Sequence, residues 1–357
     1  MTRTAVLLSG GVDSSVALRL LVEEERSGLV ACYIKIWLED ELAHLGVCPW
    51  EEDLRFAREV SETARVPLEV ISLQREYHDR VVAYTLEELR RGRTPSPDIF
   101  CNERIKFGAF LDAMDPTIQR VATGHYARIE TAPGSRGEGG AVRLLRGVDP
   151  VKDQTYFLSH LTQRQLRRAL FPVGGLEKSA VRRLAREFAL PNRDRPDSQG
   201  ICFLGKVPFD EFVRFHLGER PGDILEAGTG KKLGEHAGFW FYTIGQRKGL
   251  GLTGGPWFVV RKDIERNTVH VAHAERLEEN ARGAFQVTDA RWILEEPRDG
   301  RLEVKLRHSP RLQGATIAKE AGGGYTVRLD QKDPGIASGQ FTVFYEGNTC
   351  LGGARII

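Results

Sequence analysis

The chain contains few cysteines and no long apolar run. Its five cysteines are irregularly spaced over 357 residues, and this odd number argues against the disulfide framework of a secreted protein. No run approaches the about 18 uninterrupted apolar residues that a membrane-spanning helix needs. The first strand pattern begins within a few residues of Met1, which leaves no room for a signal peptide. We therefore expect a cytoplasmic protein without membrane contact.

Metal-binding spacings are also lacking. The sequence contains no Cys-x-x-Cys, which argues against a zinc or iron–sulfur site. His44 and Cys48 stand four residues apart, as on one side of a metal site, but no second ligand pair accompanies them. We therefore expect no resident metal ion.

Neither sign of charge dominates the chain, whose formal net charge is only +2. The basic residues nevertheless gather in residues 161–195, which hold nine lysines and arginines against three acidic residues. A local basic face on a near-neutral protein suits a polyanion such as RNA. A solvated helix surface has the same composition, so charge alone leaves both interpretations open.

Short apolar runs alternate with helical patterns in the first part of the chain. The predicted strands are residues 5–9, 29–37, 68–73 and 120–123, and the predicted helices are residues 14–25, 51–64, 77–91 and 102–114. This alternation predicts an α/β fold, in which helices cover a parallel sheet and ligands bind at the carboxyl ends of the strands. A further helical stretch is expected over residues 154–189.

The pattern changes after Gly200. From Gly222 onward, short β-like runs with frequent glycines follow one another at even spacing, which is typical of small β-barrels or sandwiches. We expect three domains: a catalytic domain (1–205) that includes the basic segment, a small β-rich central domain (206–278) and a C-terminal β-barrel (279–357). The glycine-rich stretch 132–140 is expected to form a hairpin tip.

One strand, residues 5–8, runs directly into the turn Ser9-Gly10-Gly11-Val12-Asp13-Ser14 and then into an amphipathic helix pattern. Glycine lacks a Cβ, so this turn can bend tightly and approach a ligand closely. The helix start then offers free amide groups to an anion. A Walker A loop would have Gly-Lys-Ser/Thr after four intervening residues, and this turn does not. The turn resembles the pyrophosphate loop of the N-type ATP pyrophosphatases, which split ATP between its α- and β-phosphates.

A second glycine-rich run, residues 249–255, lies among β-like runs with no helix after it. A dinucleotide-binding fingerprint would need that helix, so this interpretation fails. We expect instead a flexible loop that holds Gln246, Arg247 and Lys248 near a phosphate.

Two cysteines stand in unusual surroundings. Cys101 follows Thr94-Pro95-Ser96-Pro97-Asp98, and Asn102 is expected to cap a helix that begins beside the thiol. A helix N-terminus lowers the pKa of a thiol and favours its nucleophilic thiolate. Cys202 is flanked by apolar residues and glycines, and either cysteine alone has the alternative of being a small buried hydrophobe. Cys32 and Cys350 lie in β-like runs and are expected to be structural.

Nine blocks of sequence, in order along nearly the whole chain, resemble the tRNA-specific 2-thiouridylases. They are Ser-Gly-Gly-Val-Asp-Ser (9–14), Gly-Arg-Thr-Pro-x-Pro-Asp-x-x-Cys-Asn (92–102), Ile-Lys-Phe (105–107), Ala-Thr-Gly-His-Tyr (122–126), Lys-Asp-Gln-x-Tyr-Phe-Leu (152–158), Phe-Pro-Val-Gly (171–174), Gly-Ile-Cys-Phe (200–203), Gly-Gln-Arg-Lys-Gly-Leu-Gly (245–251) and Cys-Leu-Gly-Gly (350–353). Each block alone is weak, but the ordered set is specific.

The resemblance implies ATP as a cofactor, accompanied by Mg²⁺, and tRNA as the macromolecular partner. The residues that would hold ATP are Leu7, Leu8, Ser9, Gly10, Gly11, Val12, Asp13 and Ser14, with Ile34 and Gly124 near the adenine and ribose. The fold implied is a Rossmann-like domain of the HUP type followed by the two β-rich domains.

The resemblance also implies a mechanism. The O2 atom of the wobble uridine, in tRNAs of the Lys, Glu and Gln types, would be adenylated. Cys202 would receive a persulfide from a donor protein, either a relay protein or a cysteine desulfurase. Its terminal sulfur would attack C2, and Cys101 would then form a transient disulfide with Cys202. One-cysteine versions use a hydrosulfide freed by Cys101 instead, and Asp98 would act as an acid or base or orient the uracil.

Contacts with tRNA are implied for a larger set of residues: Ser96, Pro97 and Asp98 around the target base, His125 close by, and Lys152, Asp153, Gln154, Arg307, His308 and Gln340 elsewhere. Ser96 replaces the asparagine usual in the family, which puts details of base recognition in doubt. His308 replaces a common tyrosine, which affects only an RNA contact.

Two other functions compete with this one. Another pyrophosphate-loop ligase or amidotransferase would need no paired thiols and usually has a glutaminase domain, which this chain lacks. A non-catalytic relative would bind tRNA but would not release pyrophosphate from ATP.

Overall fold

The computed structural model describes residues 3–24, 27–36, 49–135, 140–197 and 207–357. Cys202 with its motif, the pair His44 and Cys48, and the ends of some predicted elements lie outside these residues. Within the described ranges, no helix combines the length and the apolar character that crossing a membrane requires.

A parallel sheet forms the centre of the N-terminal part. Its strands are β1 (Arg3–Leu7), β2 (Leu29–Lys35), β3 (Leu68–Ser72), β4 (Ile118–Ala122) and β7 (Ala169–Leu170), in the order β3-β2-β1-β4-β7. Every neighbouring pair is parallel. The predicted α/β architecture is confirmed, and the ligand-binding edge lies where β1, β2 and β4 end.

Helices cover both faces of this sheet because successive side chains of a strand point to opposite sides. Ala5 and Leu7 pack into one apolar cluster, which includes buried residues of α4 (Gln74–Tyr77) and α5 (Ala83–Arg90). Val6 and Leu8 pack into a second cluster with α1 (Val12–Glu23), α3 (Pro49–Ala64) and α10 (Lys178–Glu187). The strand that leads into the turn of residues 9–14 is therefore held by an apolar cluster on each face of the sheet.

The helix that contains Cys101 starts earlier than predicted. It comprises α6 (Pro97–Phe100), the π-helical η3 (Cys101–Ala109) and α7 (Phe110–Ala113), which follow one another directly. Proline suits the first helical position because the amide hydrogen that it lacks has no partner there. The prediction that Asn102 caps this helix is wrong. Asn102 is buried within it, and its side-chain amide donates to the Phe157 carbonyl at 3.1 Å.

The predicted helix over residues 77–91 is also extended at its start, because η2 (His78–Val82), another π-helical turn, joins α4 to α5. In contrast, the helical stretch predicted over 154–189 is broken. It contains α8 (Thr155–Leu158), α9 (Gln163–Leu166), the strand β7 and α10. Thr162 and Gln165 form a capping box that starts a separate helix at α9. Pro172 and the two glycines after it separate β7 from α10.

The β-rich region begins after α11 (Phe209–Leu217). A four-stranded sheet contains β8 (Gly222–Glu226), β9 (Lys232–His236), β10 (Trp257–Asp263) and β11 (Thr268–His273), in the order β10-β11-β8-β9. Two short 3₁₀ helices, η4 (Phe239–Phe241) and η5 (Ala274–Asn280), complete it. Ile224, Val259 and Val271 are fully buried in its core.

The last strands close into a six-stranded barrel, as predicted. They are β12 (Arg282–Trp292), β13 (Gly300–Lys305), β14 (Gln313–Lys319), β15 (Tyr325–Asp333), β16 (Phe341–Glu346) and β17 (Thr349–Ile356), and a β12–β17 pairing closes the ring. A hairpin from the N-terminal part, β5 (Ala127–Thr131) and β6 (Val142–Arg146), continues this sheet through β17. The stretch 132–140, predicted as a hairpin tip, falls between these two strands in the sequence, and its residues 136–139 lie outside the described residues.

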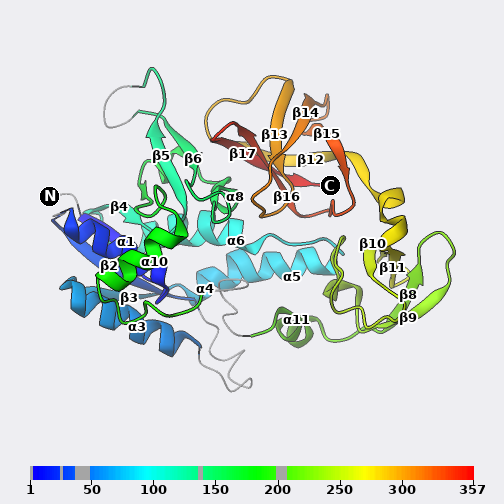
Figure 1. The fold of residues 1–357 in the computed structure, drawn as a ribbon, viewed down its shortest axis with the longest axis horizontal. Coiled ribbons are helices and arrows are strands. Elements are labelled where there is room, and N and C mark those ends of the chain that lie inside the picture. The colour runs from blue at the N-terminus through cyan, green and yellow to red at the C-terminus, as the bar shows by residue number, and fades with distance from the viewer. Residues whose placement is uncertain (1–2, 25–26, 37–48, 136–139, 198–206) are drawn as a thin grey trace.

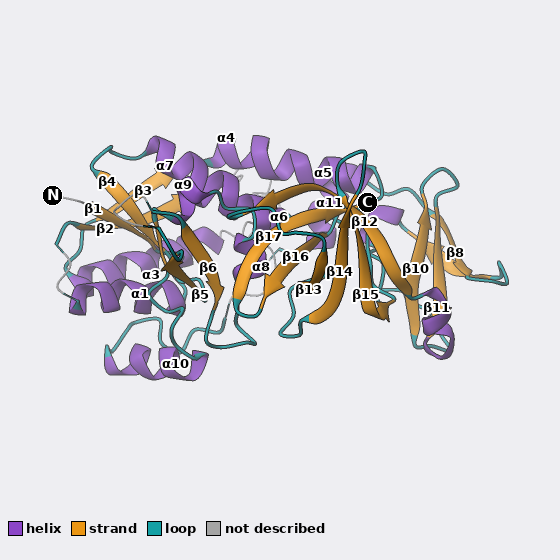
Figure 2. Cartoon of the chain, turned by 90° about the horizontal axis from the view of Figure 1, so that it is seen from above, coloured by secondary structure: helices purple, strands orange, loops and turns teal. Residues whose placement is uncertain are grey.

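The three β structures follow one another along the molecule. Figure 1 and Figure 2 show the parallel sheet at one end, the four-stranded sheet at the other, and the barrel between them. Figure 1 shows α6 and α5 leading from the parallel sheet along the side of the barrel.

Candidate active site

The turn after β1 has the shape of an anion site. Gly10 adopts φ +72°, and Gly11 stands immediately before the first residue of α1. The hydroxyl of Ser14 donates to the Gly11 carbonyl at 3.0 Å and accepts from the Ser9 amide at 3.2 Å. These bonds hold the turn in place, and the first amides of α1 face outward beyond the strand ends.

Ile34 and Gly124 flank this turn on the two neighbouring strands. Ile34 lies near the end of β2 and Gly124 two residues after β4, and both strands pair directly with β1. A Cβ built on Gly124 would lie 2.6 Å from the Ser14 amide nitrogen. Only glycine permits this approach, so the two predicted positions adjoin the turn from opposite sides.

A chain of ion pairs starts at Asp13 in the first turn of α1. The Lys178 ammonium donates to both carboxylate oxygens of Asp13, at 2.7 and 2.9 Å, and lies 2.8 Å from Asp197. Lys152 donates to Asp197 at 2.7 Å, and Arg182 donates to it as well. Burial alone would raise the pKa of Asp197, but the hydrogen bonds from Lys152 and Lys178 hold this pKa far below its usual range.

The back of the turn is held from the C-terminal end of the basic segment. The side-chain amide of Asn192, which is 1% exposed, donates to the Gly10 carbonyl at 2.8 Å and to the Ser15 hydroxyl at 2.9 Å. Arg195 donates to the same carbonyl at 3.0 Å and forms an ion pair with Asp53 of α3. The residues of this segment therefore support the turn as well as carrying charge.

Cys101 is 1% exposed in the second turn of its helix. The prediction of a thiol beside a helix N-terminus is therefore wrong, since the N-terminal amides of this helix belong to the residues after Ser96. Asp98 lies three residues earlier, on the same side of the helix, and is half-buried. The pair forms the centre of the candidate site, and the thiol must gain access before it can react.

Two tyrosines lie near the helix that carries Asp98. Tyr84 accepts a hydrogen bond from the Ser96 amide at 3.3 Å, and burial raises the pKa of Tyr84 to about 12. Burial also raises the pKa of Tyr156, whose hydroxyl donates to the Phe341 carbonyl at 2.9 Å. The charge of Arg307 lowers the pKa of Tyr156 slightly and that of Asp98 raises it.

The segment 152–158 joins the turn, the cysteine helix and the barrel. The side chain of Gln154 accepts from the Tyr126 amide at 3.0 Å, and the Tyr126 hydroxyl donates to Asp13 at 2.9 Å. Three residues after Gln154, the Phe157 carbonyl accepts from Asn102, and the Phe157 ring lies 4.7 Å from that of His308. Burial lowers the pKa of His308, so its imidazole is neutral in this contact at neutral pH.

Asp153 is buried in the same segment. Its carboxylate accepts from Lys305 at 2.6 Å, from Arg146 at 3.2 Å and from the Thr155 hydroxyl at 2.8 Å. Both Asp153 and Lys305 have fully buried side chains. The Asp153 carboxylate is therefore occupied by partners within the protein. Of the three predicted tRNA contacts in residues 152–154, only Lys152 and Gln154 are partly exposed.

The remaining predicted positions lie at two places. Gln340 adjoins the loop before α6, because the neighbouring Ser338 carbonyl accepts from the Thr94 amide at 2.8 Å. His125 is nearer the turn, and its Nδ1 lies 2.7 Å from the Thr123 hydroxyl at the end of β4. Burial lowers the pKa of His125 well below its usual value, and Lys106 adds to this effect.

Cys32 and Cys350, which were predicted to be structural, are buried in β2 and β17. They are 0% and 1% exposed, and burial raises the pKa of Cys32 to about 12 and raises that of Cys350 as well. Neither is therefore a source of thiolate at neutral pH.

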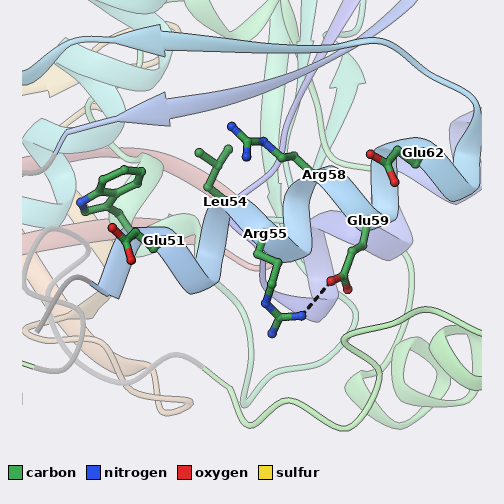
Figure 3. A pocket seen from close by; sticks show the side chains of 7 residues that line it. Glu51, Leu54, Arg55, Arg58, Glu59 and Glu62 are labelled. Carbon is green, nitrogen blue, oxygen red and sulfur yellow. Dashed lines mark hydrogen bonds and ion pairs between the residues drawn. The ribbon is translucent and has the colours of Figure 1, made fainter.

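A separate pocket of about 300 Å³ lies along the outer face of α3. It is lined by Trp50, Glu51, Leu54, Arg55, Arg58, Glu59 and Glu62. Figure 3 shows Arg55 and Glu59 paired along the helix, at 2.7 Å. None of the predicted site residues lines this pocket, and its charged side chains lie along one helix.

Sequence reasoning missed five residues at the turn: Tyr126, Lys178, Asn192, Arg195 and Asp197. Four of them lie in or just after the basic segment 161–195, whose charge drew attention only as a possible RNA surface. Tyr126 ends a block that was recognised for its glycine. The turn contains no lysine, so the sequence could have indicated that a positively charged residue from elsewhere in the chain pairs with Asp13.

Three family models match consecutive parts of the chain. A tRNA methyl transferase HUP domain matches residues 2–206, a tRNA methyl transferase PRC-barrel domain matches residues 210–273, and an aminomethyltransferase β-barrel domain matches residues 282–356.

Full-length relatives share one description. The tRNA-specific 2-thiouridylases MnmA 1 of Bacteroides thetaiotaomicron and MnmA of Parabacteroides distasonis are each 43% identical to this chain, and MnmA of Porphyromonas gingivalis is 40% identical. The alignments cover 99% of this chain in each case, and 99%, 98% and 98% of the respective relatives.

Two solved structures align with part of the chain. NMN synthetase from Francisella tularensis aligns with a TM-score of 0.34 at 19% identity, over 60% of this chain and 74% of that one. The U34-tRNA thiolase NcsA from Methanococcus maripaludis aligns with a TM-score of 0.35 at 15% identity, over 56% and 61%. These scores are too low to bear on the site.

Proposed function

Since the chain belongs to the tRNA-specific 2-thiouridylase family, we propose that it replaces the O2 atom of the wobble uridine of tRNA by sulfur, at the expense of ATP. One observation carries the assignment of its site. Gln154 connects through Tyr126 to Asp13 of the nucleotide turn, and Phe157, in the same short segment, contacts Asn102 beside Cys101. An activated base and a thiol would therefore meet across residues 152–158.

The first step uses the nucleotide turn. Residues 7–14 would hold the phosphates of ATP, with Ile34 and Gly124 beside the adenosine. The uridine O2 attacks the α-phosphorus, pyrophosphate leaves, and AMP becomes bonded to the base. This activation is needed because a carbonyl oxygen is a poor leaving group, whereas AMP is a good one. Mg²⁺ would accompany the triphosphate and neutralise its charge, and Asp13 offers the carboxylate oxygens that suit it.

The second step uses two cysteines. The terminal sulfur of a persulfide on Cys202 attacks C2, and AMP leaves. The Cys101 thiolate then attacks the Cys202 sulfur, forms a disulfide with it and releases 2-thiouridine. The persulfide sulfur is reduced to sulfide while the two cysteines are oxidised, so the electrons balance. An external thiol must reduce the disulfide before the next turnover.

The other predicted residues would bind tRNA. Asp98 would orient the base or exchange a proton with it, beside Ser96 and Pro97. The surrounding contacts would come from His125, Lys152, Gln154, Arg307, His308 and Gln340. Asp153 is buried and would position its neighbours Lys152 and Gln154 instead of contacting the RNA. We propose tRNAs of the Lys, Glu and Gln types as substrates, a relay protein or cysteine desulfurase as the persulfide donor, and the cytoplasm as the site of action.

Nucleoside mass spectrometry tests this function. The protein, ATP, tRNA and a persulfide donor should yield 2-thiouridine, and pyrophosphate release should depend on tRNA. Cys101→Ser should abolish 2-thiouridine while pyrophosphate release continues, because adenylation needs no thiol. The matched control Cys350→Ala should retain both activities. A ligase or amidotransferase would keep its product after Cys101→Ser, and a non-catalytic relative would release no pyrophosphate.

A further inference from the structure

The central domain holds two cations that the proposed function leaves unused. We propose that Arg247 and Lys248 bind backbone phosphates of the tRNA next to the target uridine, an inference that rests on the proposed function. Both side chains are exposed, in the loop between η4 and β10.

This loop lies beside the segment that leads to Asp98. The Thr94 hydroxyl donates to the Thr243 hydroxyl at 3.2 Å, and the Thr94 amide donates to the Ser338 carbonyl of the barrel at 2.8 Å. The N-terminal part, the central domain and the barrel therefore meet four residues before Asp98. Figure 1 shows the end of α5 next to the elements of the four-stranded sheet.

The loop also adjoins the predicted RNA contact Arg307. A Cβ built on Gly245 would lie 3.1 Å from the Cα of Gly335. A Cβ built on Gly335 would lie 2.7 Å from a guanidinium nitrogen of Arg307. These close approaches place Gly245, two residues before Arg247, next to the barrel residues that surround Arg307.

Hydrogen bonds tie the loop backbone to the sheet, although the sequence predicted a flexible loop. The Gln246 side chain accepts from the Thr243 amide at 2.9 Å and donates to the Lys248 carbonyl at 3.0 Å. Two backbone bonds join Gly245 and Gln246 to Val259 of β10, at 2.8 and 2.9 Å. Gln246 thus braces the residues on either side of Arg247 against the sheet.

The side chains of Arg247 and Lys248 make no hydrogen bond or ion pair with the described residues, unlike Arg307, which pairs with Asp333 at 2.9 Å. A braced loop with two unpaired cations suits phosphate oxygens, since binding needs no internal ion pair to break and little further ordering. On the proposed function, the uridine would leave the anticodon stack to reach Asp98, and its flanking phosphates would then face this junction.

The test is the salt dependence of tRNA binding by the full chain, measured by fluorescence anisotropy with labelled tRNA. Arg247→Ala/Lys248→Ala should weaken binding about tenfold and reduce the slope of log K against log[salt] by about 1.4–1.8, because two phosphate contacts are lost. The KM for tRNA should rise while kcat changes little. Arg247→Lys/Lys248→Arg, which keeps both charges, should retain the wild-type slope.

Lys231→Ala/Lys232→Ala is the matched control. It also removes two adjacent positive charges from the central domain, but on and beside β9, at the opposite edge of the sheet from β10. This variant should keep the wild-type slope. An unchanged slope in Arg247→Ala/Lys248→Ala would overturn the phosphate contact, as would a defect confined to the KM for the persulfide donor. Salt-independent binding by the wild-type protein would overturn the proposed function itself.

Discussion

The consecutive residues Lys152 and Asp153 belong to two different clusters of ion pairs, and the two clusters differ in burial. Asp153 and Lys305 have no exposed side-chain surface, and the carboxylate has five donors around it. Lys152 and Asp197 are 36% and 27% exposed and connect through Lys178 to Asp13. The buried cluster around Asp153 and Lys305, which we call the dry cluster, fixes the barrel against α8. The partly exposed cluster of Lys152, Asp197, Lys178 and Asp13, which we call the wet cluster, places charge where a triphosphate is expected.

We infer from this difference that one short segment contributes both to stability and to activity. Charges that are buried and fully bonded cannot exchange partners cheaply, because any loss leaves an uncompensated charge in the interior. Half-exposed pairs can exchange partners, since water screens the groups that are released. We therefore expect substitutions in the dry cluster to reduce stability and those in the wet cluster to reduce activity.

The largest effect is expected for Lys305→Met. Removing the ammonium leaves Asp153 buried without its main counter-charge, which should lower the free energy of unfolding by about 3–5 kcal/mol. Chemical denaturation followed by circular dichroism measures this. The matched control is Lys319→Met in the same barrel, where the ion pair with Glu296 has a similar length of 2.7 Å but lies in solvent. Equal effects of the two substitutions would contradict the distinction.

His160 contacts strand β17 of the barrel and should make the interface between the barrel and the N-terminal part sensitive to acid. Burial lowers its pKa to about 4, and its Nε2 donates to the Gly353 carbonyl at 3.2 Å. Below an unfolded-state pKa of about 6.5 the unfolded chain binds a proton that the folded chain does not. Stability should therefore fall by up to about 3 kcal/mol as the pH drops from about 6.5 to 4.

Denaturation midpoints of the wild type and of His160→Gln across this pH range measure the contribution. The variant should show a shallower loss because glutamine does not titrate. If the denaturation midpoints of the two proteins fell in parallel with pH, His160 would not be the cause of the loss of stability in acid.

Lys178→Met should affect activity more than stability. Its ammonium is the cation that contacts Asp13 of the nucleotide turn, and charge develops on the phosphates as pyrophosphate leaves. Loss of such a group should slow tRNA-dependent pyrophosphate release about 100-fold. Lys178→Arg should restore part of the rate. Arg183→Met, on the exposed side of the same helix, is the control that should leave the rate unchanged. A normal rate in Lys178→Met would show that the wet cluster is only structural.

The smallest effect is expected for Lys152→Ala. Asp197 would keep Lys178 and Arg182 as partners, so the free energy of unfolding should change by less than about 1 kcal/mol. The KM for tRNA should rise several-fold, because Lys152 is half-exposed at the proposed RNA surface. Steady-state kinetics with varied tRNA, beside a denaturation curve, separate the two quantities. A stability loss as large as that of Lys305→Met would mean that both clusters are structural.

The sequence predicted what depends on local pattern. The continuous apolar run of β1, which is buried from Thr4 to Leu7, the glycine turn and the barrel strands follow from local residue pattern and from turn chemistry, and all are present. The helix start at Asn102 was wrong because Pro97 begins a helix one turn earlier. The helical stretch predicted over 154–189 contains three helices, but it is interrupted by β7, which pairs with β4 through residues about fifty positions apart.

The partners of the turn could not be predicted for the same reason. Lys178 and Asn192 reach residues 10–15 only after α10 packs beside α1, and no local pattern encodes that approach. Asp153 illustrates the opposite error. The family resemblance implied a tRNA contact for Asp153, but its side chain is fully buried with that of Lys305, from a strand about 150 positions away.

The most direct test asks whether Cys101 and Cys202 act as a pair on the base that the turn activates. Peptides mapped by mass spectrometry without reduction, after turnover with ATP, tRNA and a persulfide donor, should include Cys101 linked to Cys202. The linked peptides should be absent when ATP or tRNA is omitted. Formation of 2-thiouridine at the full rate in Cys202→Ser, with no linked peptide in the wild type, would contradict the account.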